Sequence, residues 1–502
     1  MYIIKYFYSL IFRYKFLLVL IIFLEVSFLI RIHQWSLVAF HDENSRDYLV
    51  ANHIYKYHEF PLAGPGDEGR YFLRNSPFYF YFLASFLFMQ DSLNFLEMVN
   101  IFLQLANIVI IYLLAKRLFG VYPALISSAI FAFGDYFVSQ SNILWQPYIM
   151  QPFVNLSYLL LAIGYQKRNY PLLIIAVIIF LLAATLHRSA IAQLPLIILV
   201  ILLILKSWKA KLMIYVSTVI TVIVVQLLLY LPVLFSKLRT TLDDVPYFNR
   251  NLEKLSPFLP EVLLVLVSYF ILSKSPHKRI SFIIMAAIFL QLCVAAFFGL
   301  TDIRYFTPIL ALFVILVSAA IACSSYIRKL PNIIRVALAI LIIYSVSPNL
   351  YSKFTNSLEV SKKADFPPTA TVVKKVVEIK KSENFPDYKF FRITTYRNGN
   401  KYGRLEGAFY VPLEKMLNQK FVAVDENALL FNNTSYVINN YYETNNDNYY
   451  FLVCYEYKNL AMINEYCLNS FLQDNKNFDI IDLIYQGIVH ENMSIYLLKK
   501  NA

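Results

Sequence analysis

Long apolar runs recur along most of this chain, and they restrict its fold more than any other feature. Two of them are FLLVLIIFLEVSFLI at 16–30 and LIIAVIIFLLAATL at 173–186. A helix needs about 20 apolar residues to cross the hydrocarbon core of a bilayer. Charged residues make up only 15% of the chain, whereas soluble domains average about 25%. The sequence therefore predicts a polytopic α-helical membrane protein.

The basic residues lie largely between the apolar runs, where membrane topology explains them. Cytoplasmic loops of membrane proteins carry an excess of Lys and Arg, so the formal charge of +13 does not indicate a nucleic-acid partner. Lys5, Arg13 and Lys15 precede the first run, and no small-residue cleavage site follows it. We interpret this run as a signal anchor with a cytoplasmic N-terminus, in contact with membrane lipids.

With the N-terminus inside, one set of about 11 spans puts every short basic loop on the cytoplasmic side. The basic loops are at 116–117, 167–168, 206–211, 274–279 and 328–335. The predicted spans are 16–32, 95–116, 121–139, 148–166, 170–187, 190–206, 212–235, 259–273, 280–299, 305–325 and 333–350. Because this number is odd, everything after residue 350 is expected outside. We predict a transmembrane domain at 1–350 with a first outer loop at 33–92.

The segment SPFYFYFLASFLFM at 76–89 is apolar but short for a span. Counting it as a span would invert every later loop, so we interpret 76–92 as a helix at the outer surface of the membrane. Aromatic side chains are common at the level of the lipid headgroups. Tyr79 and Tyr81 are therefore expected to be anchors at that level.

The composition changes after about residue 351. The stretch 351–502 is polar, with strand-like alternation in FFRITTY, YYFLVCYEY and MSIYLLKK and helical spacing in NLAMINEYCLNSFLQD. We predict an extracytoplasmic α/β domain at 351–502. Cys454 and Cys467 could form a disulfide there in an oxidising compartment, but their separation in sequence leaves the pairing open.

Two adjacent carboxylates, Asp42 and Glu43, follow the first span directly. Acidic residues beside a bilayer are costly unless they are solvated or used. A carboxylate can take a proton from an attacking hydroxyl, and cations can stabilise a departing phosphate. Alternatively, the acidic pair begins a solvated loop, Asp47 forms a solvated pair with Arg46, and the cations extend toward headgroups. The candidate cations of the outer face are Arg70, Arg74, His187, Arg188 and Arg304.

Several segments occur in the order of a known family. They are HDENSRDYLVANHIYKYHEFPLAGP (41–65), SPFYFYFLASFL (76–87), YLLAKRLFGVYPALISSAIFAF (112–133), SQSNILWQPYIMQPF (139–153), TLHRSAIAQLPL (185–196) and IRYFTPILALF (303–313). This order resembles the bacterial GT-C glycosyltransferases of family 39 and the protein-mannosyltransferase type. The resemblance covers residues 1–350 and implies a GT-C fold.

The resemblance also implies an activity, the transfer of a sugar from a polyprenyl-phosphate donor to an acceptor on the outer face of a bacterial inner membrane, with inversion. Asp42 matches the catalytic base of the family, and Glu43 matches the adjoining acidic position. Two positions depart from the family, since Gln146 and Pro147 replace a second acidic residue and Ser76–Pro77 replaces a double proline. The residues implied to bind lipid phosphate or sugar are Arg70, Arg74, His187, Arg188, Arg304 and Tyr305.

Other classes of protein stay open. A transporter or flippase of lipid-linked sugars would also have many spans, although no segment recurs as an internal repeat. A membrane-anchored binding protein would not need so many spans. CxxC, HExxH and Gly-rich phosphate motifs do not occur in the sequence, so no metal site is assigned and a divalent cation is left open. The acceptor can be a polysaccharide, a lipid or a protein.

Overall fold

The chain divides into two compact units. Met1–Trp35, Tyr71–Tyr79 and Leu96–Ser357 form the helical unit, and Ser36–Arg70, Phe80–Phe95 and Leu358–Ala502 form the sheet unit. The domain boundary predicted at residue 350 lies outside the described residues. The computed structural model describes residues 2–33, 42–58, 60–61, 76–91, 93–141, 143–204, 259–298, 303–323, 367–385, 391–397, 400–401, 449–456, 464–474, 477–488 and 492–500.

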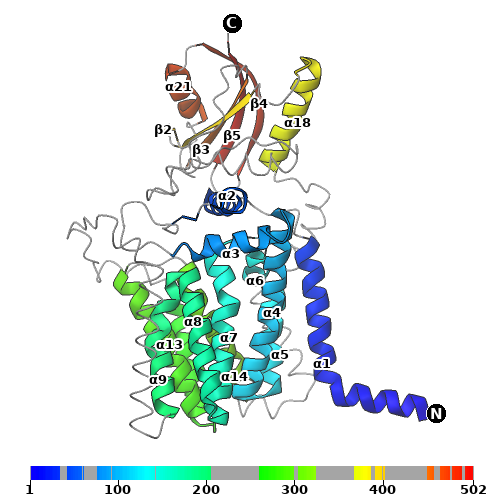
Figure 1. Cartoon of the computed structure of the whole chain (residues 1–502), viewed down its shortest axis with the longest axis vertical. Coiled ribbons are helices and arrows are strands. Elements are labelled where there is room, and N and C mark those ends of the chain that lie inside the picture. Colours follow the sequence, from blue (N-terminus) through cyan, green and yellow to red (C-terminus); the bar gives the residue numbers. More distant parts are fainter. Residues whose placement is uncertain are drawn as a thin grey trace. The chain divides into compact units, whose positions relative to one another are not determined.

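Helices make up all of the described secondary structure of the helical unit, and Figure 1 shows several of them running side by side. Among these, α7 packs against α8, and α14 packs against α5, α7, α12 and α13. The helices are α1 (Tyr2–His33), α4 (Leu93–Phe119), α5 (Val121–Phe133), α6 (Asp135–Gln140), α7 (Gln146–Lys167), α8 (Tyr170–Leu186), η3 (Arg188–Gln193), α9 (Leu194–Ile204), α12 (Leu259–Ser273), α13 (Lys278–Phe298), η6 (Ile303–Phe306) and α14 (Thr307–Cys323).

These helices occupy most of the segments that were predicted to span the membrane. The predicted spans 212–235 and 333–350 lie outside the described residues, so the number of spans stays a prediction. Among the described residues, Phe95–Phe119 and Lys278–Ala295 are long and apolar enough to cross a membrane. The other apolar helices among the described residues are shorter, at 10–17 residues.

Short turns between helices depend on particular residues. Gly120 separates α4 from α5 with a φ of 98°, which side chains with a Cβ rarely adopt. Gly164 allows α7 and α8 to approach closely, since a Cβ there would lie 2.6 Å from Cδ2 of Leu173. Asn169 caps α8 by accepting a hydrogen bond from the backbone N–H of Leu172 at 3.2 Å. The α7–α8 pair is therefore a tight antiparallel hairpin.

A buried arginine joins α1 to the break between α5 and α6. Arg31 is only 1% exposed, and its guanidinium donates to the backbone oxygens of Ala132 at 2.9 Å and Phe131 at 3.0 Å. Its Nε donates to Oγ of Ser141 at 2.6 Å. The carbonyls at the end of α5 lack helical partners, and a cation is favourable there. Arg31 therefore fixes α1 against this corner.

Helix α2 (Asp42–Tyr57) begins at the acidic pair and buries one face. Asp47, Val50, Ala51 and Ile54 share this face at helical spacing and are each 0% exposed. The prediction that Asp47 is solvated is therefore wrong, because Asp47 lies inside the protein, and the side chain of Arg46 lies outside the described residues.

Helix α3 (Phe78–Leu87) occupies part of the predicted surface helix. Tyr79 is 0% exposed, so it is buried against protein and is not a headgroup anchor as predicted. The hydroxyl of Tyr81 donates to the backbone oxygen of Pro61. Aromatic contacts between Tyr55 and Phe88, at a centroid distance of 5.3 Å, join α2 to the end of α3.

The sheet unit contains a mixed sheet in the order β2-β1-β3-β5-β4, in which only β1 and β3 are parallel. The segments predicted as strands at 390–396, 449–457 and 493–500 form β1, β3 and β5, and the predicted helix forms α21. The sequence interpretation missed β4 and α18. The elements are α18 (Pro367–Ser382), β1 (Phe391–Arg397), β2 (Asn400–Lys401), β3 (Tyr449–Glu456), α21 (Asn464–Asp474), β4 (Phe478–Ile488) and β5 (Asn492–Lys500).

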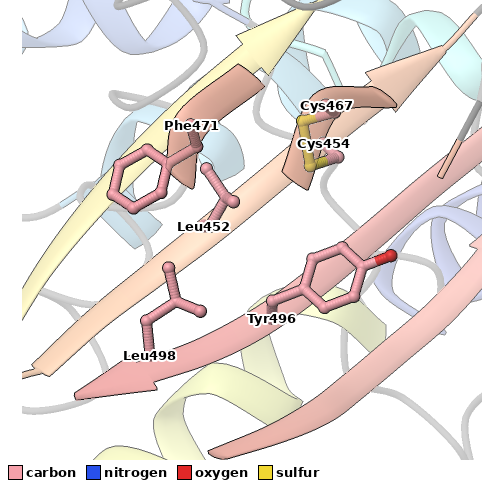
Figure 2. Packing of buried hydrophobic residues seen from close by; sticks show 6 residues of the cluster. All are labelled: Leu452, Cys454, Cys467, Phe471, Tyr496 and Leu498. Carbon is pink, nitrogen blue, oxygen red and sulfur yellow. A yellow bond between two sulfur atoms is a disulfide. The ribbon is translucent and has the colours of Figure 1, made fainter. Parts of the chain in front are cut away.

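Helices α21 and α18 flank the sheet (Figure 1). Successive residues of a strand point to opposite faces, and on β3 Leu452 and Cys454 pack toward α21, whereas Tyr449 contacts Glu383 just after α18. Cys454 and Cys467 form a disulfide that joins β3 to α21. The pairing that the sequence left open is therefore present in the structure. Figure 2 shows this bond within an apolar cluster that also includes Phe471.

Candidate active site

His187 lies at the junction of α8 and η3. It ends α8 in an extended conformation, with φ −151° and ψ 128°, and it caps η3. Its Nδ1 accepts a hydrogen bond from the backbone N–H of Ser189 at 3.3 Å and lies 2.7 Å from Oγ of the same residue. In the neutral ring the proton is therefore on Nε2. Because His187 is only 4% exposed, it does not extend toward lipid headgroups.

Two more of the predicted binding residues lie beside His187. The ring of Tyr305, in η6, is 5.8 Å from the imidazole between centroids. Nη2 of Arg188 donates to the hydroxyl of Tyr305 at 3.5 Å, a long hydrogen bond. Tyr305 is 6% exposed, whereas Arg188 is half-buried. The fold thus brings Tyr305 beside the adjacent residues His187 and Arg188, which precede it by more than a hundred positions in the sequence.

A pair of buried glutamines holds the two 3-10 helices in place. Nε2 of Gln291, on α13, donates to the backbone oxygens of Tyr305 at 2.6 Å and Ser189 at 3.2 Å. Its Oε1 accepts from Nε2 of Gln193 at 2.8 Å. Gln193 also donates to the backbone oxygen of Ala287 at 3.2 Å. Gln291 is therefore the residue that connects the Arg188 segment to the Tyr305 segment.

A second group of buried amides links α4, α7 and α14. Nδ2 of Asn155 donates to Oδ1 of Asn107 at 2.8 Å, and Nδ2 of Asn107 donates to Oε1 of Gln151 at 3.1 Å. Nε2 of Gln151 reaches the backbone oxygen of Thr307 at 3.5 Å, next to η6. None of these residues, nor Gln193 or Gln291, was predicted from the sequence as a site residue. Amide side chains within apolar helices were the available signal, because such groups must find partners in a membrane.

No described side chain places the remaining predicted site residues in this cluster, although Arg304 directly precedes Tyr305 in η6. Asp42 and Glu43 form the first turn of α2 in the sheet unit, and their side chains lie outside the described part of the chain, as does the side chain of Arg304. Arg70 and Arg74 lie wholly outside it. In the described residues no group of three His, Cys, Asp or Glu side chains could hold a metal ion.

Comparison with solved structures identifies the architecture. The chain matches ArnT from Cupriavidus metallidurans bound to undecaprenyl phosphate at 11% identity with a TM-score of 0.52, over 95% of this chain and 97% of that one. The apo state of ArnT gives the same values. The fold is that of the GT-C glycosyltransferases.

Other solved structures of this class give lower scores. The oligosaccharyltransferase AglB from Archaeoglobus fulgidus, in complex with an inhibitory peptide and a dolichol-phosphate, matches at 13% identity with a TM-score of 0.46, over 89% of this chain and 70% of that one. No family model and no curated protein match the sequence. The GT-C fold and the two long apolar helices support a location in a membrane.

Proposed function

We propose that this chain is an integral-membrane glycosyltransferase that moves a sugar from a polyprenyl-phosphate donor to an acceptor on the extracytoplasmic face. The observation that carries the proposal is the likeness to ArnT over nearly the whole length of both chains, since that protein was crystallised with undecaprenyl phosphate. The cluster of His187, Arg188 and Tyr305 supports it with groups that suit a lipid phosphate.

In this proposal Arg188 binds the phosphate of the donor. A guanidinium is always charged and offers planar donors that match phosphate oxygens. The Tyr305 hydroxyl and Nε2–H of a neutral His187 add donors that carry no charge of their own. Negative charge grows on the phosphate as its bond to the sugar breaks, so donors fixed in place stabilise the transition state more than the ground state.

Asp42 is the general base of the proposed reaction. Its carboxylate takes the proton of the acceptor hydroxyl while that oxygen forms a bond to the anomeric carbon. The bond from this carbon to the phosphate oxygen breaks, and the lipid phosphate leaves with the electron pair. Attack opposite to the leaving group inverts the anomeric carbon. The first turn of a helix favours negative charge, which suits an ionised Asp42 with Glu43 beside it.

The disulfide between Cys454 and Cys467 supports the proposed orientation. Disulfides persist in oxidising compartments and are rare in the cytosol. We therefore assign the sheet unit to the outer side of a bacterial inner membrane, with the N-terminus in the cytoplasm.

The proposal is tested with the wild type and Asp42→Asn in liposomes that contain labelled polyprenyl-phosphate sugars, with a membrane extract as the acceptor source. We expect label to move to a new product with the wild type and not with Asp42→Asn. Asp91→Asn, which changes an exposed carboxylate after α3, is the matched control and should keep full transfer. Equal transfer by the wild type and Asp42→Asn would show that Asp42 is not the general base. Label that crosses the bilayer without transfer to a product would indicate a flippase.

A further inference from the structure

The helical unit contains a pocket of about 120 Å³ that the proposed reaction does not use. It lies between α4, α7, α9, α13 and α14. Its walls are apolar and include the buried side chains of Leu114, Leu161, Ile197 and Ile284. A concave site with mostly apolar walls and a charged residue at its edge is typical of a ligand pocket.

One end of the pocket, at Gln166 and Arg279, lies at the end of the bundle where the cations gather. Nε2 of Gln166 donates to the backbone oxygen of Arg117 at 3.3 Å, and the ring of Phe119 lies 5.2 Å from that of His277. The ends of α4 and α7 and the turn before α13 therefore lie together, and we call this the basic end. Its exposed cations are Lys116, Arg117, Lys167, Arg168, Lys274, Lys278 and Arg279.

The depth of the pocket matches one leaflet of a bilayer. Its lining runs along α7 from Gln166 to Tyr158, which is about 12 Å at the rise of an α-helix. The hydrocarbon core of a bilayer is about 30 Å thick, so one leaflet contributes about 15 Å. Along α13, Arg279 is about 18 Å from Gln291 by the same rise, so the cationic end of the pocket is separate from the His187 cluster.

Arg279 gives this pocket a preference for negative charge. It lines the pocket, it is exposed, and it forms no ion pair with any residue that the structure describes. A guanidinium pairs readily with a phosphate, and anionic lipids attract clustered cations beside the membrane. The wall behind Arg279 is apolar, as a hydrocarbon chain requires.

We propose that this pocket binds one acyl chain of an anionic phospholipid from the cytoplasmic leaflet, with the lipid phosphate against Arg279. The cations of the basic end identify the leaflet, because cytoplasmic loops are enriched in Lys and Arg. This lipid is not the sugar donor, and the inference depends on a membrane location but not on the transfer reaction.

The test is native mass spectrometry of the delipidated full-length chain, titrated separately with phosphatidylglycerol and phosphatidylcholine. We expect tighter retention of phosphatidylglycerol, and Arg279→Gln should weaken it about tenfold, as loss of a charge-assisted pair does. Lys278→Gln removes a neighbouring exposed cation that does not line the pocket, so it is the matched control and should retain the lipid fully. Equal retention by wild type and Arg279→Gln would overturn the proposal.

Two variants examine the hydrocarbon part of the site. Ala162→Phe fills the pocket and should abolish retention of both lipids, with the thermal transition of the variant as a check of folding. The hydroxyl of Tyr158 is buried and forms no hydrogen bond with the described residues, and an acyl chain cannot bond to it. Tyr158→Phe should therefore retain phosphatidylglycerol as well as the wild type does.

Three further outcomes would contradict the proposal. Weaker retention by Tyr158→Phe indicates a polar ligand, and full retention by Ala162→Phe places the lipid elsewhere. A polyprenyl phosphate that displaces phosphatidylglycerol assigns the pocket to the donor. All of these measure lipid retention, so they are independent of whether Asp42→Asn abolishes sugar transfer.

Discussion

In the helical unit, buried amide side chains bond to backbone carbonyls of other elements, as Gln291 does with Ser189 and Tyr305. In the sheet unit, the described interior between the sheet and α21 is an apolar cluster closed by the disulfide of Cys454, and the ion pairs described for α18, β4 and β5 lie at the surface. The first unit therefore uses buried polar groups to set the geometry of a site. The second uses apolar burial and a covalent bond to set its stability.

The surroundings proposed for each unit account for this difference. Within a membrane, apolar burial does not distinguish protein from lipid, so packing and hydrogen bonds decide how helices meet. In water, removal of apolar surface drives folding, and a small domain gains further stability from a disulfide. We therefore expect changes in the helical unit to alter sugar transfer and changes in the sheet unit to alter unfolding.

The largest expected effect is that of Arg188→Gln, which removes the cation of the His187 cluster. Transfer should fall by about 10³-fold, because a fixed donor to a developing charge is worth about 10² to 10³ in rate and this donor is also charged. The measurement is the rate of label transfer in liposomes. Arg168→Gln changes an exposed arginine at the basic end and should keep the wild-type rate. An equal loss in both variants would argue against phosphate binding by Arg188.

The second effect concerns the sheet unit alone. The double variant Cys454→Ser/Cys467→Ser should lower the free energy of unfolding of this unit by about 3 kcal/mol, the value for a loop of this length. Limited proteolysis in increasing urea, with fragments assigned to each unit, measures it. Cys293→Ser, which changes an unpaired cysteine of α13, is the control. Equal loss of protection in the helical unit would contradict the division proposed above.

Much of the fold could be predicted because its signals are local. Apolar runs between basic turns located α4, α7, α8 and α13, and period-two alternation located β3. The strand β4 was missed because FDIIDLIYQGI contains two register shifts, between Ile480 and Asp482 and between Leu483 and Tyr485. Such irregularities break the alternation on which strand prediction depends.

The candidate site was predicted only in part because its members are distant in sequence. His187, Arg188 and Tyr305 were named from helix ends and from the resemblance, and the fold brings them together. Asp47 was misplaced because a charged residue is usually exposed, whereas tertiary packing buries this one. The contacts of Gln291 depend on how α13 packs against η3 and η6, which no local pattern encodes.

The third effect tests Gln291 as a positioning residue. Gln291→Leu leaves the backbone oxygens of Ser189 and Tyr305 without this partner, which costs about 1–3 kcal/mol. We expect kcat/KM for the donor to fall about tenfold, mostly through KM, because the cluster loses its alignment. Gln104→Leu removes an equally buried amide that bonds to the backbone oxygen of Tyr148 at 2.9 Å. Gln104→Leu should lower the free energy of unfolding by a similar amount without changing KM. If both variants change KM equally, the role of Gln291 is structural and does not include positioning of the cluster.

The smallest effect concerns an ionic contact on the surface of the sheet unit. The hydroxyl of Tyr449 and the ammonium of Lys499, whose Nζ is 2.9 Å away, both donate to the Glu383 carboxylate. The hydrogen bond from Tyr449 makes the largest contribution to lowering the pKa of Glu383, and the hydrogen bond from Lys499 lowers it further. A lowered pKa adds stability above the pKa of the unfolded state, near 4.3, and this stability is lost as pH falls.

Glu383→Gln should therefore lower the stability of the sheet unit at pH 7 and have a smaller effect at pH 3. The side chains of Glu383 and Lys499 are 35% and 45% exposed, so solvent screening keeps the effect below about 1 kcal/mol. Glu378→Gln removes a more exposed carboxylate, 3.9 Å from Lys375, and should change stability less. Urea unfolding at the two pH values measures the difference. A pH-independent loss would show that Glu383 stabilises the sheet by packing and not by its charge.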